Sequence, residues 1–345
     1  MPELRYRPYE LPLRETFTIS RGSTDVQPTM IVQLGERGCY GYGEATTNRY
    51  YGVTLDRMAD ALERVRPAIE ATPAERPDEL LAAVGHTLRA EGPDAFPLCA
   101  IDQAAHDLWG KLAGKPLAEL WGLDRTHAPL SNYTIGIDTI PKMVEKLQKW
   151  SDWPIFKIKL GTDNDLEIVR ELRRCTDAVF RVDANCGWSA DQAIDYSAEL
   201  KELGVEFIEQ PLPAEDTAGA ERVFAGSPLP VVADESCVVE ADVARCAGRF
   251  HGVNVKLMKC GGLAPARRML EEARGLGMKT MVGCMTESTV GISAIAQLLP
   301  MLDYVDMDGA ALLASDIAAG AEVVRGECRL PDAPGSGVRL LDGPL

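Results

Sequence analysis

Residues 133–306 repeat one pattern, a short apolar run followed by an amphipathic stretch of helical period. The apolar runs are Tyr133–Ile137, Ile155–Leu160, Val179–Asp183, Val205–Glu209, Val231–Asp234, Val253–Leu257, Thr280–Cys284 and Tyr304–Asp306. Seven helical stretches separate these eight runs, among them Asp165–Cys175, Ala190–Leu203, Ala264–Leu276 and Ser288–Leu299. Eight strands that alternate with seven helices predict an α/β fold, a modified TIM-type (β/α)7β barrel over residues 126–317.

An open, doubly wound sheet is the alternative for this alternation. Such sheets commonly bind dinucleotides through a G-x-G-x-x-G motif after the first strand. No such motif follows Tyr133–Ile137, and Gly261-Gly262 alone is typical of a turn or a helix start. The sequence therefore favours the barrel.

Residues 1–125 have a different texture, which predicts a separate α+β capping domain. Alternating apolar and polar residues predict four strands, at Leu4–Arg7, Thr16–Ile19, Thr29–Gln33 and Cys39–Tyr42. From residue 54 to 123 the apolar residues recur with helical period, which predicts a bundle of helices. The tail, about 318–345, is strand-like and rich in Gly and Pro, and we expect it to pack back on this domain.

Charge and hydropathy limit the partners of this chain. It carries 36 basic and 52 acidic side chains, a net charge of −16, and its longest basic runs are Arg173-Arg174 and Arg267-Arg268. Nucleic-acid surfaces need clustered Lys and Arg, so we expect no nucleic-acid partner. The most apolar stretch, 290–302, is too short and interrupted for a membrane span, and the N-terminal stretch lacks a signal-peptide core.

Cysteine usage points to a compartment. Nine cysteines without a C-x-x-C pair favour free thiols in a reducing environment, so we expect a cytoplasmic protein. Closed homo-oligomers are common among soluble proteins, and a homo-oligomer of this chain is compatible with its composition.

Charged residues end one apolar run after another. Steps of 24, 26, 25 and 22 residues, each close to one strand-helix unit, separate Lys159, Asp183, Glu209, Asp234 and Lys256. The carboxyl ends of all strands of a βα barrel meet at one rim. We therefore expect these side chains to converge on one cavity.

Three of these residues are acidic and come from neighbouring strands: Asp183, Glu209 and Asp234. Three hard oxygen ligands at one point suit Mg²⁺, which keeps positions open for water or substrate. The alternative is that each carboxylate caps the helix that follows, since Asp is a favoured N-cap residue. Glu is a poor cap and Pro211 follows Glu209 closely, so the set favours a metal site.

Two lysines, Lys157 and Lys159, lie two residues apart and hence on the same face of a strand. A neighbouring like charge lowers the pKa of a lysine, which predicts a general base that works near neutral pH. The alternative is a solvated strand face. In a barrel strand that face points inward, where unpaired lysines are costly.

Lys256 ends the sixth run, in Val-Asn-Val-Lys-Leu-Met-Lys. Strands two and six of an eight-stranded barrel are diametrically opposed, so Lys159 and Lys256 would face each other across the metal. Two such bases could remove a proton from one face of a carbon and return one to the other, while the metal stabilises an enolate. The alternative for Lys256 is a lysine that extends to water at the rim, and we expect this arrangement for Lys259.

With these residues in order, the chain resembles the enolase superfamily in its muconate-lactonising branch. The resemblance covers nearly the whole length: a capping domain, the Lys-x-Lys strand, the three acidic residues and the sixth-strand lysine. Within that branch, several segments are similar to the dipeptide epimerases, the group that includes L-Ala-D/L-Glu epimerase. These segments are Ile19–Ser23, Ala233–Cys237, Asn254–Lys259, Gly283–Met285 and Asp306–Gly309.

The resemblance implies Mg²⁺-dependent epimerisation of the C-terminal residue of a dipeptide by two-base 1,1-proton transfer, with one Mg²⁺ per subunit. By the same resemblance Lys159 and Lys256 are the acid/base catalysts. Lys157 tunes Lys159 and contacts the substrate carboxylate.

An Asp-x-Asp after the last strand is the most discriminating segment. The resemblance implies that Asp306 and Asp308 bind the free amino terminus of the substrate, since two carboxylates suit an ammonium group. The alternative is a pair of helix-capping or solvated aspartates. Thr134 and Cys284 would line the pocket, and Asn185 would support the site from behind the ligands.

The first capping loop departs from the acid-specific relatives. After Arg21-Gly22-Ser23 such relatives place an additional Arg, whereas this chain has Thr24-Asp25. This argues against a cationic clamp for a glutamate side chain, and the preferred dipeptide need not be Ala-Glu. Candidate specificity residues, each of which also suits a structural role, are Arg21, Arg49, Tyr50 and Tyr51.

Three other functions stay open. An N-acylamino acid racemase or o-succinylbenzoate synthase of the same branch uses the same two lysines without an ammonium site. A muconate cycloisomerase needs a pocket for a flat dianion, which Asp306 and Asp308 disfavour by their charge. A non-catalytic barrel that binds metal and small carboxylates belongs to another class, and the complete set of lysines and acidic residues argues against it.

Overall fold

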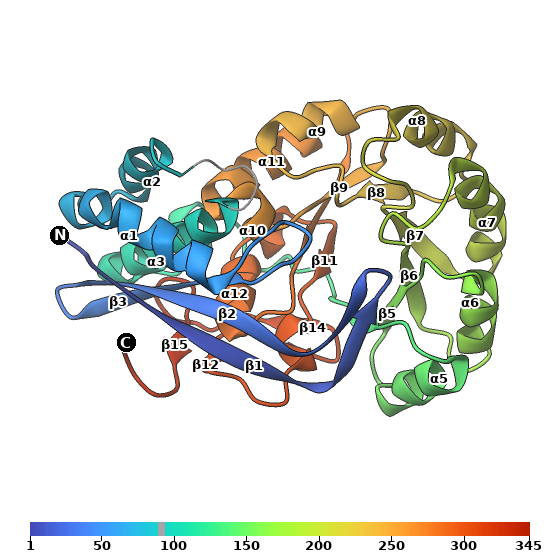
Figure 1. Ribbon diagram of the computed structural model, residues 1–345, viewed down its shortest axis with the longest axis horizontal. Helices are drawn as coiled ribbons and strands as arrows, with labels where there is room; N and C mark the ends of the chain where they lie inside the picture. Colours follow the sequence, from blue (N-terminus) through green and yellow to red (C-terminus); the bar gives the residue numbers. More distant parts are fainter. Residues whose placement is uncertain (89–93) are drawn as a thin grey trace.

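The eight predicted strands form one parallel sheet in a computed structural model that describes residues 1–88 and 94–345 (Figure 1). The sheet contains the strands in chain order, from β4 to β11. They are β4 (Tyr133–Ile135), β5 (Ile155–Lys159), β6 (Val179–Asp183), β7 (Val205–Glu209), β8 (Val231–Ala233), β9 (Gly252–Val255), β10 (Lys279–Gly283) and β11 (Tyr304–Asp306). A parallel bridge between Ser131 and Val305 brings the first and last strands together. The prediction of a modified TIM-type barrel is therefore confirmed, and each strand begins and ends within two residues of its predicted run.

Helices surround the barrel (Figure 1). They are α5 (Ile140–Lys149), α6 (Asp165–Arg173), α7 (Ala190–Glu202), α8 (Thr217–Gly226), α9 (Glu240–Cys246), the single-turn α10 (Leu257–Cys260), α11 (Leu263–Gly275) and α12 (Thr289–Ala296). The last helix ends earlier than predicted, because Pro300 cannot donate a backbone hydrogen bond and residues 299–301 form a 3-10 turn instead. A second 3-10 turn, Gly309–Leu312, follows β11.

The N-terminal region forms a three-stranded antiparallel sheet of β1 (Glu3–Ile19), β2 (Gly22–Glu36) and β3 (Cys39–Thr46). The sequence predicted two separate strands where the structure has the single strand β1. Pro8 and Pro12 do not break β1, because it is the edge strand and its outer side needs no partner. The register shifts only between Pro12 and Phe17.

The described part of this region also contains the helices α1 (Leu55–Ala71), α2 (Pro77–Gly85), α3 (Ala95–Ala113) and α4 (Leu117–Leu120). The tail adds the short strands β12 (Ala318–Ala319), β13 (Glu322–Val324), β14 (Glu327–Arg329) and β15 (Arg339–Leu340). The chain end lies against the N-terminal sheet, where the backbone N–H of Leu345 donates to Gln33 at 2.6 Å. Within the described ranges no helix combines the length and the apolar character that a bilayer crossing requires.

The β1–β2 hairpin reaches from the N-terminal sheet to the carboxyl ends of the barrel strands (Figure 1). The backbone N–H of Ile137, after β4, donates to the carbonyl of Thr18 at 2.9 Å. Gly136 permits this approach, because a Cβ there would lie 2.9 Å from the same carbonyl oxygen. Across the rim, Arg21 at the hairpin tip pairs with Glu235 after β8 at 2.8 Å. The hairpin therefore spans the rim at which the predicted site lies.

Acidic residues of the N-terminal region cap two barrel helices. Asp102 of α3 accepts from the backbone N–H groups of Leu263 and Ala264 at the start of α11. Glu44 of β3 accepts from the N–H groups of Ser288 and Gly291 at the start of α12, both at 3.1 Å. Negative charge at a helix N-terminus is favourable, so these contacts hold the cap against the barrel beside β9 and β10.

The contact between His106 and Asp102, both in α3, predicts that the stability of the protein depends on pH. Burial lowers the pKa of His106, but the Asp102 carboxylate, 3.4 Å from Nδ1, raises it by more than burial lowers it. The pKa of His106 is therefore above its usual value. Stability from this pair is complete below the unfolded pKa of about 6.5 and is lost as the pH rises through the folded value. We expect the free energy of unfolding to fall from about pH 6 to about pH 9 more steeply than in His106→Gln.

Urea unfolding at several pH values measures this difference. His86→Gln, at the exposed C-terminal end of α2, is the control and should keep the steeper dependence. Parallel curves for His106→Gln and the unmodified protein would contradict the assignment.

Candidate active site

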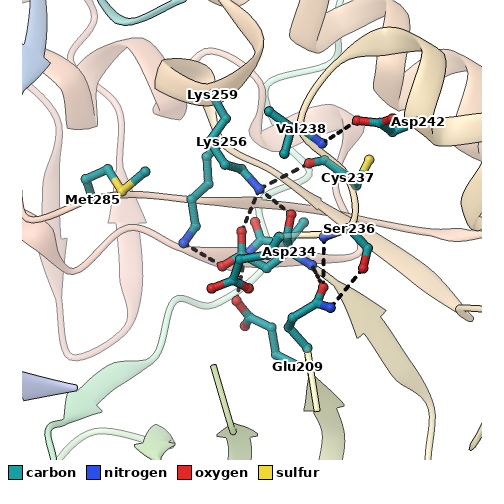
Figure 2. Close-up of polar contacts among 12 residues, drawn as sticks. Glu209, Asp234, Ser236, Cys237, Val238, Asp242, Lys256, Lys259 and Met285 are labelled. Carbon is teal, nitrogen blue, oxygen red and sulfur yellow. Dashed lines mark hydrogen bonds and ion pairs between the residues drawn. The ribbon is translucent and has the colours of Figure 1, made fainter. Parts of the chain in front are cut away.

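Three buried carboxylates meet at the rim. Asp183 and Glu209 are the last residues of β6 and β7, and Asp234 follows β8 directly. One oxygen of each lies within 4.8 Å of the others. Figure 2 shows Glu209 and Asp234 turned toward each other beside the two lysines 256 and 259. The structure thus brings together the three residues that the sequence predicted as metal ligands.

The two lysines of β5 lie on the inner face of the barrel, against these carboxylates. Lys157 Nζ lies 2.8 Å from Glu209, 3.2 Å from Asp183 and 2.9 Å from Asp306. Lys159 Nζ donates to Asp183 Oδ2 at 2.6 Å. β5 is buried along its whole length, because its other face packs under the helices.

The predicted fall in lysine pKa is wrong for Lys157. Burial lowers its pKa, but the Asp306, Glu209 and Asp183 carboxylates together raise it well above the usual value. The sequence argument considered only the neighbouring lysine. In the folded protein three carboxylates lie within 3.2 Å of Lys157 Nζ.

Lys256 and Lys259 both contact Asp234. Lys256 Nζ donates to Oδ2 at 2.8 Å. Lys259 Nζ donates to Oδ1 at 2.6 Å, to the Asp234 carbonyl and, at 3.1 Å, to the Cys237 carbonyl (Figure 2). The predicted position of Lys259 at the rim, extended to water, is therefore wrong, since only 1% of it is exposed.

The change from strand to helix explains this error. β9 ends at Val255 and the one-turn helix α10 begins at Leu257. Residues three apart lie on the same face of a helix, whereas they lie on opposite faces of a strand. Lys259 is therefore turned to the same carboxylate as Lys256.

Asp306 and Asp308 form a second acidic pair beside the first strand. Asn132 Nδ2 donates to Asp306 Oδ1 at 2.8 Å, and the backbone N–H of Thr134 donates to Asp308 Oδ2 at 2.6 Å. Cys284 Sγ lies 3.9 Å from the other oxygen of Asp308. Burial and the neighbouring Asp306 raise the pKa of Asp308 to about 8. A group with positive charge would relieve this repulsion.

The candidate specificity residues lie at the hairpin and the loop after β3. The Arg21 guanidinium lies 4.5 Å from the centre of the Tyr50 ring and is paired with Glu235. Tyr51 packs between Tyr50 and Phe96. Arg49 is exposed, in the turn between β3 and α1.

Some polar residues of the site were not predicted. Asn254 Nδ2, from β9, donates to Glu209 Oε1 at 2.9 Å. Gln210 Oε1 accepts from the backbone N–H groups of Asp234 and Ser236. A usable signal for Asn254 was present, since it lies two residues before Lys256 in an otherwise apolar run and hence on the same face.

The acidic triad fits Mg²⁺. All three ligands are carboxylates, the type that Mg²⁺ prefers. Burial and Asp183 raise the pKa of Glu209 to about 7, and its Oε2 is buried yet accepts no hydrogen bond from any described residue. Lys157 Nζ is near this oxygen, at 2.8 Å. A divalent cation would be a second positively charged partner for this oxygen.

Similar proteins are enzymes with the same architecture. An L-Ala-D/L-amino acid epimerase of Flavobacterium johnsoniae is 56% identical over 98% of this chain and 100% of its own length. An L-Ala-D/L-Glu epimerase of Bacteroides thetaiotaomicron is 40% identical over 97% of this chain and 87% of its own. A solved dipeptide epimerase from Enterococcus faecalis, complexed with Mg and the dipeptide L-Leu-L-Tyr, is 28% identical, with a TM-score of 0.91 over 97% of this chain and 98% of that one.

Two family models together span most of the chain. Residues 2–122 match the model of the mandelate racemase / muconate lactonizing enzyme N-terminal domain, and residues 142–343 match the model described as enolase C-terminal domain-like. These matches agree with the barrel, the cap and the residues at the rim, and they show that the chain belongs to the mandelate racemase / muconate lactonizing enzyme family of the enolase superfamily.

Proposed function

We propose that this protein is a Mg²⁺-dependent dipeptide epimerase that inverts the α-carbon of the C-terminal residue. One observation carries the proposal. Two amines flank the acidic triad at its two ends, Lys159 on Asp183 and Lys256 on Asp234, from the second and sixth strands of eight. An α-carbon held between them would present one face to each amine.

The lysines move the proton. Lys159 or Lys256 Nζ takes the α-proton from one face, and the other donates a proton to the opposite face. Lys157 stays charged among its carboxylates and would bind the substrate carboxylate. Asp183, Glu209 and Asp234 would hold Mg²⁺, which when bound supplies positive charge for the developing enolate.

The amino terminus of the dipeptide belongs beside Asp306 and Asp308. Both carboxylates are buried, and of the two it is Asp306 that forms an ion pair with Lys157, at 2.9 Å. One oxygen of Asp308 lies 3.9 Å from Cys284 Sγ, and the other accepts from the backbone N–H of Thr134. We therefore propose Asp306, Asp308, Thr134 and Cys284 as the substrate contacts that distinguish a dipeptide from an N-acylated amino acid.

The other parts of the assignment follow from the same proposal. We propose residues 1–125 with the tail from about 318 as the cap, and residues 126–317 as the catalytic barrel. The nine free thiols favour a reducing compartment, so we propose a cytoplasmic enzyme. The relatives carry the names of epimerases that act on different dipeptides. Arg21 is already paired with Glu235, so its charge is not offered to a negatively charged second residue, and we propose that the second residue is uncharged.

A second candidate is an N-acylamino acid racemase. An N-succinyl Arg/Lys racemase of Bacillus cereus has a TM-score of 0.91 to this chain at 26% identity, over 98% of this chain and 95% of that one. Such an enzyme needs the lysines but no ammonium site. The buried pair Asp306 and Asp308 favours the dipeptide.

Incubation with a dipeptide library and Mg²⁺ in D₂O tests the proposal. We expect deuterium at the α-carbon of the second residue and the appearance of the other epimer. Mass spectrometry measures the deuterium, and NMR measures the epimers. Uncharged second residues should react faster than Glu. Absence of α-deuterium from every dipeptide, with uptake into N-acylamino acids, would replace the first candidate by the second.

A further inference from the structure

One oxygen of each carboxylate of the acidic triad accepts a hydrogen bond from a donor of its own. The backbone N–H of Asn185 donates to Asp183 Oδ1 at 2.9 Å. Asn254 Nδ2 donates to Glu209 Oε1 at 2.9 Å, and Lys259 Nζ donates to Asp234 Oδ1 at 2.6 Å. We call these three donors the outer anchors.

The second oxygen of each carboxylate is paired with one or more of the lysines Lys157, Lys159 and Lys256. Asp183 Oδ2 contacts Lys157 and Lys159, and Glu209 Oε2 contacts Lys157. Asp234 Oδ2 contacts Lys256, whose side chain is 12% exposed. Each carboxylate therefore has one oxygen bound by an outer anchor and the other paired with the lysines that the proposed reaction uses.

Two of the outer anchors are side chains that are buried in the barrel. Asn254 is completely buried and Lys259 is 1% exposed. Lys259 also binds the carbonyls of Asp234 and Cys237, so it joins the side chain of the ligand to its own backbone. The side chain of Gln210 holds the same backbone from the other side, by accepting from the N–H of Asp234. Rotation of the Asp234 carboxylate would break several of these contacts together.

We propose that the outer anchors make the site selective for Mg²⁺ over Ca²⁺, with Lys259 and Asn254 as positioning residues. Mg²⁺ demands near-octahedral coordination at short distances, which one oxygen per carboxylate satisfies. Ca²⁺ takes six to eight oxygens and readily uses both oxygens of one carboxylate. An occupied outer oxygen denies Ca²⁺ that second contact. The inference rests on the proposed metal centre of the enzyme.

Loss of an anchor has an electrostatic effect as well as a geometric one. Removal of the Lys259 charge strengthens the binding of any divalent cation nearby. Because Mg²⁺ and Ca²⁺ carry the same charge, this effect largely cancels in the ratio of their dissociation constants. The ratio therefore reports on the freedom of the carboxylate, which a merely structural role for Lys259 would not change.

Isothermal titration of the metal-free protein with Mg²⁺ or Ca²⁺ alone tests the proposal in Lys259→Met and Asn254→Ala. Lys111→Met is the matched control, because Lys111 Nζ also binds one carboxylate and two carbonyls, those of Asp107, Tyr40 and Val338, but in the cap. We expect the ratio of the Ca²⁺ to the Mg²⁺ dissociation constant to fall about tenfold in each anchor variant and to stay within about twofold in the control.

A ratio within about twofold of the unmodified protein in the folded anchor variants overturns the proposal, as does an equal fall in Lys111→Met. The two substitutions act on different carboxylates, so the test stands if only one variant folds. Binding is measured without substrate. A protein that selects Mg²⁺ yet turns over no dipeptide would therefore contradict the proposed function while it leaves the anchors in place.

Discussion

Lys159→Ala and Lys256→Ala should each lose α-proton exchange from a different epimer of the same dipeptide. The two amines come from the second and sixth strands and contact opposite ends of the acidic triad. Each base therefore reaches one face of the α-carbon. General acid–base catalysis contributes about 10²- to 10⁴-fold, so epimerisation, which needs both bases, should fall by at least that factor in either variant.

Proton NMR in D₂O measures the rate of α-proton exchange separately for the L,L and L,D dipeptides. Each variant should retain exchange with the epimer whose proton faces the remaining lysine. Lys142→Ala on the exposed side of α5 is the control and should exchange both epimers at the unmodified rate. Equal loss of exchange from both epimers in both variants would contradict a two-base mechanism.

Asp308→Asn should lower kcat/KM for dipeptides about 10- to 100-fold, because a hydrogen bond to a charged group contributes about 1.5–3 kcal/mol. The amide keeps the shape of the side chain but loses the charge that attracts the ammonium group. An N-acetylated dipeptide or an N-succinylamino acid has no ammonium, so its slow turnover should be unchanged. A parallel loss for both substrate types would show that Asp308 only supports the structure of the loop.

Asp308 also predicts a pH dependence. Its pKa is raised to about 8, so below that pH a bound ammonium must displace a proton from the buried pair. The apparent affinity for dipeptides should therefore increase as the pH rises from about 6 toward 8, and the dipeptide amino group itself loses its charge above about 8. In Asp308→Asn this increase in affinity should be absent. Measurement of KM for both proteins from about pH 6 to about pH 8 tests this prediction.

The positions of the barrel strands followed from sequence because burial on both faces requires continuous apolar runs, and these runs are visible without a structure. The spacing of charged residues at the run ends likewise predicted which of them meet. Lys259 was misplaced because the strand period was continued past Val255, where the chain turns into α10. The sequence predicted two strands where β1 is one, because the alternating pattern was followed only at its two ends; the edge strand continues through Pro8 and Pro12 between them.

Order and chemical type along the chain were enough to determine the barrel, the family resemblance and the residues that gather at the rim, since a repeated strand-helix unit leaves few ways to fold. Only the tertiary structure decided the ion pairs that raise the pKa of Lys157, the anchoring of each carboxylate and the pairing of Arg21 with Glu235. These properties depend on distances of a few ångströms between residues from different strands. Electrostatic and hydrogen-bond energies change steeply over such distances, and spacing in sequence does not specify them.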